Sequence, residues 1–210
     1  ADLSAIHIIC DPLLLESNGS RSFLDTPFRY ELDQLALMYL LARQGGFILH
    51  AAGVEIQGCG LIFPGRSGAG KTTLSRLIHA FSPDAVINDD RMAIRQNGSV
   101  FNGYGTPWPG EANISRNRAA ALKAFMFLKH ATDYAVNPLS PAESMERILV
   151  TASIPWYDRE VVDALLPRIE RLVEEVPAYE LSFKPEPEAA VWINNLVTAG
   201  TLSGFPHRSR

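Results

Sequence analysis

Residues 65–72 combine residue types and a spacing that suit the binding of a triphosphate. The segment reads Gly-Arg-Ser-Gly-Ala-Gly-Lys-Thr and fits the phosphate-loop pattern at every defined position. Its three glycines let successive backbone N–H groups approach an anion closely. Lys71 offers a positive charge to the outer phosphates, and the hydroxyl of Thr72 can reach Mg²⁺. The alternative interpretation is a chance glycine-rich turn.

These types and this spacing predict ATP and Mg²⁺ as cofactors. GTP, ADP or pyrophosphate remain open as donors, because such a loop contacts phosphates and not the base. The predicted nucleotide-binding residues are Gly65, Ser67, Gly68, Ala69, Gly70, Lys71, Thr72 and Thr73.

Phosphoryl transfer also needs a carboxylate for the metal and a group that activates the acceptor. Asp89 and Asp90 end a short apolar segment, and adjacent side chains on a strand face opposite ways. One acid is therefore expected to hold Mg²⁺ and the other to accept a proton, unless the pair is a solvated turn. His50 lies in an apolar segment that a hairpin would bring near Lys71, although a lone histidine there also suits a core.

The surrounding pattern predicts the elements that position these residues. Residues 47–56 and 61–63 are expected to form strands joined by a turn at 57–60, and 72–81 the helix after the loop. Asn97-Gly98 between apolar segments indicates a hairpin. Further strands are expected at 6–10, 85–87, 92–95, 99–101, 124–128 and 178–183, further helices at 32–43, 141–152, 159–175 and 186–197, and loops at 17–20 and 205–210.

Composition limits the class of protein and its partners. The chain has 210 residues, 47% of them hydrophobic, with a net charge of −4, so a globular domain without a basic excess for nucleic acid is expected. No apolar run approaches the ~20 residues of a membrane span. Two cysteines, Cys10 and Cys59, favour reduced thiols and a cytoplasmic location. The first residue is Ala1, which leaves room for a preceding segment.

Three segments together resemble the catalytic domain of the HPr serine kinase/phosphorylase family and its small bacterial relatives. They are residues 50–54, 60–73 and 88–91, and the softer likeness extends over most of 45–183. The resemblance implies an α/β fold like that of phosphoenolpyruvate carboxykinase, with a mixed sheet and a β-hairpin that leads into the phosphate loop. The short turn expected at 57–60 agrees with a β-hairpin before the loop. It is too short for a βαβ crossover, which needs a dozen or more residues.

Carried over, the resemblance implies Lys71, Asp90 and His50 as catalytic residues, and Thr72 and Asp89 as metal ligands. It implies a single catalytic domain over 1–210, with an N-terminal segment (1–44), a nucleotide-binding core (45–137) and a helical C-terminal part (138–210). It also raises the expectation of a homo-oligomer. The implied activity is an ATP- and Mg-dependent kinase that phosphorylates a serine of a protein, a peptide or the free amino acid.

The chain departs from the family pattern where residues 108–111 occupy the region of a downstream glycine-rich signature, and this departure argues against phosphorolysis and against HPr as the acceptor. A regulatory nucleotide-binding module and an NTP hydrolase are the alternative functions. Glu111, in a rigid loop with Trp108, could hold a second cation or the acceptor, or the loop could be structural. Arg116 and Arg118 could stabilise a transition-state phosphoryl group or lie in a solvated loop. Arg91 could pair with the two acids or with phosphate.

Overall fold

The computed structural model describes residues 15–18, 21–24 and 32–200, so the strand expected at 6–10 and the end at 205–210 lie outside it. In chain order the elements are β1 (Leu15–Asn18), β2 (Arg21–Leu24), α1 (Leu32–Arg43), β3 (Phe47–Ile56), β4 (Cys59–Pro64), α2 (Lys71–Phe81), the 3-10 helix η2 (Pro83–Ala85), β5 (Val86–Asn88), β6 (Arg91–Asn97), β7 (Val100–Gly105), β8 (Ala119–His130), β9 (Ala135–Pro138), α3 (Pro141–Thr151), β10 (Ala152–Ser153), α4 (Arg159–Glu175), β11 (Ala178–Phe183) and α5 (Glu188–Thr198).

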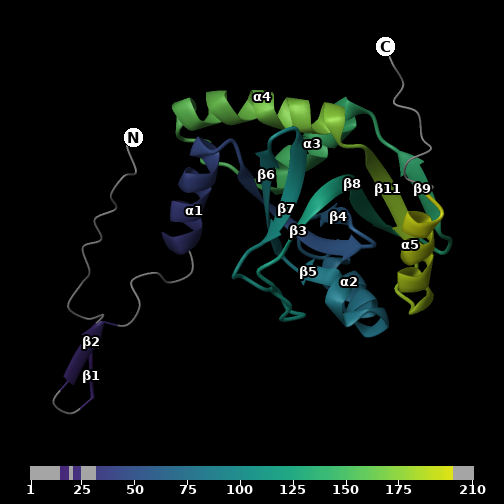
Figure 1. Ribbon diagram of the computed structural model, residues 1–210, viewed down its shortest axis with the longest axis horizontal. Coiled ribbons are helices and arrows are strands. Elements are labelled where there is room, and N and C mark those ends of the chain that lie inside the picture. Colours follow the sequence, from purple (N-terminus) through teal and green to yellow (C-terminus); the bar gives the residue numbers. More distant parts are fainter. Residues whose placement is uncertain (1–14, 19–20, 25–31, 201–210) are drawn as a thin grey trace.

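Nine strands form one mixed sheet, in which β3 changes partners halfway along its length (Figure 1). The first half of β3 pairs with β6 and β10, and the second half with β4 and β5. The strands β6 and β7 form a hairpin, β7 pairs with β8, and β8 runs parallel to both β4 and β11. The pairings β3-β6-β7-β8-β4-β3 thus close a ring, and the expected mixed α/β sheet is confirmed.

The strand before the glycine-rich loop enters through a tight hairpin. β3 and β4 pair antiparallel from Ala51↔Pro64 to Ile56↔Cys59, so Gln57 and Gly58 make the whole turn. Both residues have positive φ, 50° and 77°, as the twist of a two-residue hairpin requires. This turn fixes β4 beside β3, and it brings the end of β4 level with the middle of β3.

Two apolar clusters cover opposite faces of the sheet. One joins strand residues such as Leu49 and Phe125 to α3 and α4 through Ile148 and Ile169. The other joins Leu61 and its neighbours to α2 and α5. Burying a large apolar side chain contributes roughly 1.5–3 kcal/mol, so both layers hold the sheet rigid. A third, smaller cluster packs α1 on β3 and β6 through Leu41, Ile48 and Ala93, with Leu37, Met38, Tyr104 and Trp108 around them.

Most of the expected elements form within a few residues of their predicted bounds. The helices expected at 32–43 and 159–175 and the strand expected at 178–183 have those limits in the structure. β8 is much longer than the predicted 124–128, and β9 and β10 were not predicted. Residues 17 and 18, expected in a loop, belong to β1, which pairs with β2 in a separate two-stranded sheet.

The nine-stranded sheet takes strands from both sides of the boundary expected at residue 137, since β11 pairs with β8 and β9. The division of the chain into parts at residues 44 and 137 stays a prediction. Among the described residues, none of the helices has the length and apolar character needed to cross a membrane.

Candidate functional site

The glycine-rich loop connects the end of β4 to the start of α2. The N–H of Gly65 donates to the carbonyl of His50 at 3.1 Å, which ties the loop to β3. Gly68 and Gly70 have φ values of 84° and 97°. Glycine adopts such positive φ values with little strain, whereas residues with a side chain rarely do. The loop therefore has a defined path over the C-terminal end of β4.

The N-terminus of α2 opens onto this loop without a side-chain cap. Gly70 is the N-cap residue and makes no side-chain hydrogen bond to the first turn. The first N–H groups of a helix have no intrahelical partner, and the helix dipole adds partial positive charge there. An anion held by the loop would supply the missing acceptors.

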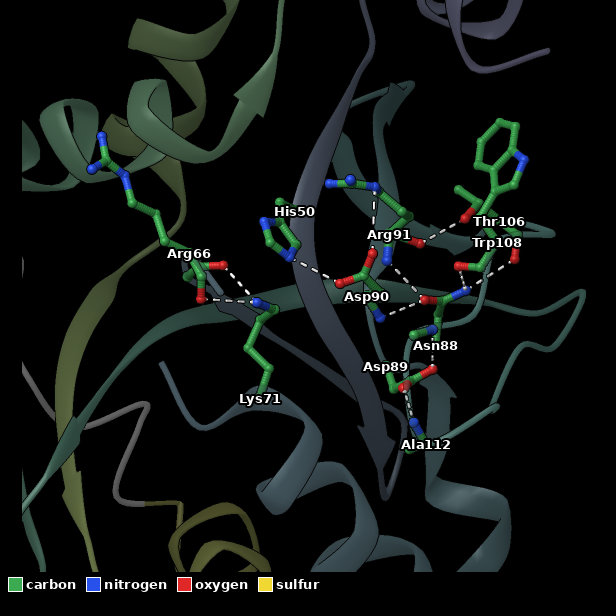
Figure 2. Close-up of polar contacts among 12 residues, drawn as sticks. His50, Arg66, Lys71, Asn88, Asp89, Asp90, Arg91, Thr106, Trp108 and Ala112 are labelled. Carbon is green, nitrogen blue, oxygen red and sulfur yellow. Dashed lines mark hydrogen bonds and ion pairs between the residues drawn. The ribbon is translucent and has the colours of Figure 1, made fainter. Parts of the chain in front are cut away.

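Lys71 is the first residue of α2 and folds back over the loop. Its Nζ donates to the carbonyls of Gly65 at 2.7 Å and Arg66 at 3.2 Å, and the side chain is 5% exposed (Figure 2). Burial lowers the pKa of Lys71, while the nearby charge of Asp90 acts in the opposite direction. A phosphate oxygen could replace these carbonyls as acceptor and gain a charge-assisted bond.

His50 and Asp90 form a close pair beside this lysine. His50 Nε2 lies 2.9 Å from Asp90 Oδ1 (Figure 2). The backbone carbonyl of Asp90 accepts from Ala51 N at 2.9 Å. Burial alone would raise the pKa of Asp90, but the hydrogen bond and charge of His50, with Arg91 and Lys71, lower it below its ordinary value. Asp90 is therefore ionised at neutral pH, and the structure brings together the sequence-predicted Lys71, His50 and Asp90.

Asn88, which the sequence analysis did not single out, shapes the backbone that carries Asp90. Its Oδ1 accepts from the N–H groups of Asp90 and Arg91, both at 2.8 Å. Its Nδ2 donates to the carbonyls of Thr106 at 2.9 Å and Trp108 at 3.3 Å. An asparagine that bonds the backbone two residues on is a frequent turn former, and this local signal in Asn-Asp-Asp could have identified it.

Asp89 has an environment very different from that of Asp90. It is 1% exposed, and its carboxylate accepts N–H donors from Gly110 at 2.8 Å, Ala112 at 2.7 Å and Ile114 at 3.2 Å. A carboxylate has about four acceptor sites, so these bonds use most of its capacity. These bonds make Asp89 the anchor of the loop at 110–114. Its role as a ligand of Mg²⁺ stays a prediction.

The two arginines that the sequence analysis considered for phosphoryl stabilisation have other partners. Arg116 forms an ion pair with Asp84 at 2.7 Å, and Arg118 forms one with Glu55 at 2.8 Å. Both contacts lie around η2 and the β3–β4 turn. These side chains hold the loop before β8 against that region.

Trp108 and Glu111 belong to the loop that Asp89 anchors. Trp108 Nε1 donates to Asp33 Oδ2 at 2.7 Å, which joins this loop to the start of α1. Glu111 is exposed, and its carbonyl accepts from Arg76 at 2.9 Å. Trp108 thus has a structural partner, whereas the carboxylate of Glu111 faces solvent.

His130, to which the sequence analysis gave no role, lies against the glycine-rich loop. A Cβ on Gly70 would come within 3.1 Å of its ring, and the ring centroid is 5.6 Å from that of Phe183. The parallel pairing of β8 with β4 and β11 puts these strand ends at one edge of the sheet. Local sequence carries no signal of this contact, which depends on that pairing.

The side chains near the glycine-rich loop that could coordinate a metal ion are few, which suits a magnesium ion held mainly by a nucleotide. In the part of the chain that the structure describes, no group of three or more His, Cys, Asp or Glu side chains gathers to hold a metal. Mg²⁺ at such sites commonly takes one or two protein groups together with phosphate oxygens and water. Thr72, in the first turn of α2, fits that role.

A separate cavity of about 260 Å³ lies at the far end of α2, beside Phe81, Ile56 and Ala190. Two charged side chains that line the cavity, Glu55 and Arg118, form an ion pair with each other. It contains none of the residues of the glycine-rich loop. The chemistry therefore gathers at the N-terminal end of α2 and not in this cavity.

No protein-family model matches the chain, and no curated protein matches it either. A solved structure of the Hpr(Ser) kinase/phosphatase from Coxiella burnetii is similar over 74% of this chain and 97% of that chain, with 12% identity and a TM-score of 0.42. A likeness this weak does not identify the function of the chain. Membership of the family that the motifs resemble therefore stays a prediction.

Proposed function

We propose that this chain is a nucleoside-triphosphate-dependent kinase that transfers a phosphoryl group to a hydroxyl. The observation that carries the proposal is the convergence of Lys71 and the His50–Asp90 pair. The carbonyl of His50 holds the glycine-rich loop through Gly65 N, and its imidazole holds Asp90. Phosphate binding and hydroxyl activation would thus meet beside the middle of β3.

In this proposal residues 65–73 bind the triphosphate. The N–H groups of the loop and the first turn of α2 surround the phosphates, and Lys71 exchanges its loop carbonyls for phosphate oxygens. The hydroxyl of Thr72 would hold Mg²⁺, which when bound would supply positive charge to stabilise the transferring phosphoryl group. ATP is the proposed donor, and the cytoplasm, where ATP is abundant, the proposed location.

Asp90 is the proposed base. Its Oδ1 is held by His50, and its Oδ2 lies 3.5 Å from Arg91 Nε, beyond a good hydrogen bond. Oδ2 is therefore the oxygen free to accept the proton of an attacking hydroxyl as the new O–P bond forms. His50 would orient Asp90 and lie near the phosphates. Asp89 serves the site indirectly, by anchoring the loop at 110–114.

The proposed acceptor is the hydroxyl of a serine, in a protein, a peptide or the free amino acid. A hydrolase would use the same loop and the same base with water as acceptor. A regulatory module would bind the nucleotide without transfer, yet the free Oδ2 of Asp90 beside Lys71 favours transfer. An assembly of several copies stays a prediction.

The deciding experiment follows label from the γ-phosphate of Mg-ATP onto free serine, HPr and serine-ended peptides. Label on an acceptor, lost in Lys71→Ala, would support the kinase. ATP consumption that no acceptor accelerates would favour the hydrolase. Stabilisation by Mg-ATP without any turnover would favour the regulatory module. Absence of any Mg-ATP binding would overturn all three.

A further inference from the structure

Arg91 is a largely buried cation without adequate partners. Its side chain is 19% exposed, and the one ion pair that it makes with a described residue, between Nε and Asp90 Oδ2, spans 3.5 Å. The Nε atom is buried and makes no hydrogen bond to any described residue. Arginine normally uses its five N–H donors when it leaves water.

This arrangement costs stability as it stands. A buried donor without an acceptor has lost its hydration without compensation, and the loss is larger when the group is charged. Asp90 compensates little, because it lies beyond hydrogen-bond length and its other oxygen is engaged by His50. Nε itself is closed to solvent, so a ligand would meet the terminal nitrogens, whose planar fork matches two acceptor oxygens.

A second unsatisfied donor lies on the helix that faces the same part of the sheet. Gln34 Nε2 is buried without a partner among the described residues. Helical spacing puts Gln34 on the face of α1 that carries Leu37 and Leu41, which pack with Ile48 and Ala93.

The β3–β6 register continues that face toward the site. Ile48 pairs with Ala93, and His50 pairs with Arg91, so alternate residues place His50 and Arg91 on the face that α1 covers. The contact of Trp108 with Asp33 ties the start of α1 to the loop beside Asp90. Both unsatisfied atoms are donors, so this face of the sheet is short of acceptors.

The position of Arg91 distinguishes the acceptor from the nucleotide. His50 contacts Asp90 Oδ1, on the side of Lys71 and the glycine-rich loop, whereas Arg91 contacts Oδ2 (Figure 2). A nucleotide on the loop would lie on the His50 side. A molecule whose hydroxyl meets Oδ2 would have its neighbouring groups against Arg91.

We propose that Arg91 binds a carboxylate of the phosphoryl acceptor, which makes it a specificity-determining residue. This inference rests on the proposed function and narrows its substrate class to hydroxyl compounds with a carboxylate close to the hydroxyl. Free serine and a peptide that ends in serine have this chemistry, whereas an internal serine does not.

The test compares matched probes with and without the carboxylate. Equilibrium binding, in the presence of Mg-ADP, is measured for L-serine against L-serinamide and for one serine-ended peptide with a free or an amidated C-terminus. The proteins are the parent chain, Arg91→Met, Arg91→Lys and the control Arg95→Met, which changes an exposed arginine on the same strand. Mg-ATP binding and thermal unfolding are measured for all four.

We expect the parent chain to bind at least one carboxylate probe about tenfold or more tightly than its amide. Arg91→Met should abolish that preference, Arg91→Lys should retain part of it, and Arg95→Met should leave it unchanged. Mg-ATP binding should change less than about threefold in Arg91→Met. Its unfolding temperature should stay level or rise, because an unsatisfied cation is replaced by an apolar chain of similar length.

Equal binding of carboxylate and amide by the parent chain, or no binding of any probe, would overturn the inference. So would a preference that survives in Arg91→Met, or a loss of Mg-ATP affinity there, which would make Arg91 a ligand of the nucleotide. Failure of the parent chain to bind Mg-ATP would be a failure of the proposed function itself, visible separately from the carboxylate preference. A large fall in unfolding temperature in both Arg91 variants would assign Arg91 a structural role.

Discussion

The 2.9 Å contact between His50 Nε2 and Asp90 Oδ1 joins the middle of β3 to the turn that starts β6. On the other side of His50, its carbonyl accepts from Gly65 N, at the start of the glycine-rich loop. One residue therefore links the loop that would hold phosphate to the acid that would take a proton. A small change at His50 is expected to disturb both parts of the site.

Lys71→Ala should abolish stabilisation by Mg-ATP. The substitution removes the cation closest to the loop, and charge-assisted bonds to phosphate are among the strongest in a protein. Thermal unfolding with and without Mg-ATP measures the effect. Lys123→Ala is the matched control, because Lys123 is exposed on β8. Equal stabilisation by Mg-ATP in Lys71→Ala and the parent chain would contradict the phosphate-loop assignment.

Asp90→Asn should leave Mg-ATP binding nearly intact and reduce transfer by about 10²–10⁴-fold, the usual contribution of a general base. The amide keeps an acceptor for His50 but cannot take the proton. Label transfer and Mg-ATP affinity are measured on the same preparation, with Asp133→Asn, an exposed carboxylate, as control. Transfer at the parent rate would remove Asp90 from the mechanism as base.

The sequence predicts those parts of the site that depend on local pattern. The loop at 65–72, the hairpin before it and the helix after it follow from glycine spacing, a short turn and apolar periodicity. The same holds for α1, α4 and β11, whose bounds match the expectation. The assignment of roles to Asp89 and Asp90 does not follow in this way, because their partners come from distant segments.

The three donors to Asp89 come from residues 110–114, and the partner of Asp90 is on β3. Two adjacent acids therefore look equivalent in sequence and differ only in the tertiary structure. The length of β8 has a similar cause, because its first residues pair with β7 and its last with β11. Strands as short as β10 carry no periodic signal at all.

Asp89→Asn should destabilise the fold by about 2–4 kcal/mol. The side-chain amide would direct an N–H group at backbone donors that now bond the buried carboxylate, and buried networks lose several kcal/mol when one partner changes. Chemical denaturation without nucleotide or metal measures the loss. An unchanged free energy of unfolding, together with weaker Mg²⁺-dependent nucleotide binding, would instead return Asp89 to the role of metal ligand.

Asp90 should also make stability depend on pH in the acid range. Its pKa is lower in the folded chain than in the unfolded chain, chiefly because His50, Arg91 and Lys71 outweigh the effect of burial. The unfolded state therefore binds more protons in this range, and stability rises with pH. The stabilisation is complete above the unfolded pKa, near pH 4, and is lost as the pH falls through the lower folded pKa.

The free-energy difference between the parent chain and Asp90→Asn should accordingly be largest near neutral pH, at about 1–3 kcal/mol, and shrink below about pH 4. Denaturant unfolding of both chains at several pH values measures this difference. The contributions of the other titratable groups cancel in it because both chains have them. A difference that is constant with pH, or that grows in acid, would mean that Asp90 is not held as a carboxylate by His50 and its neighbours.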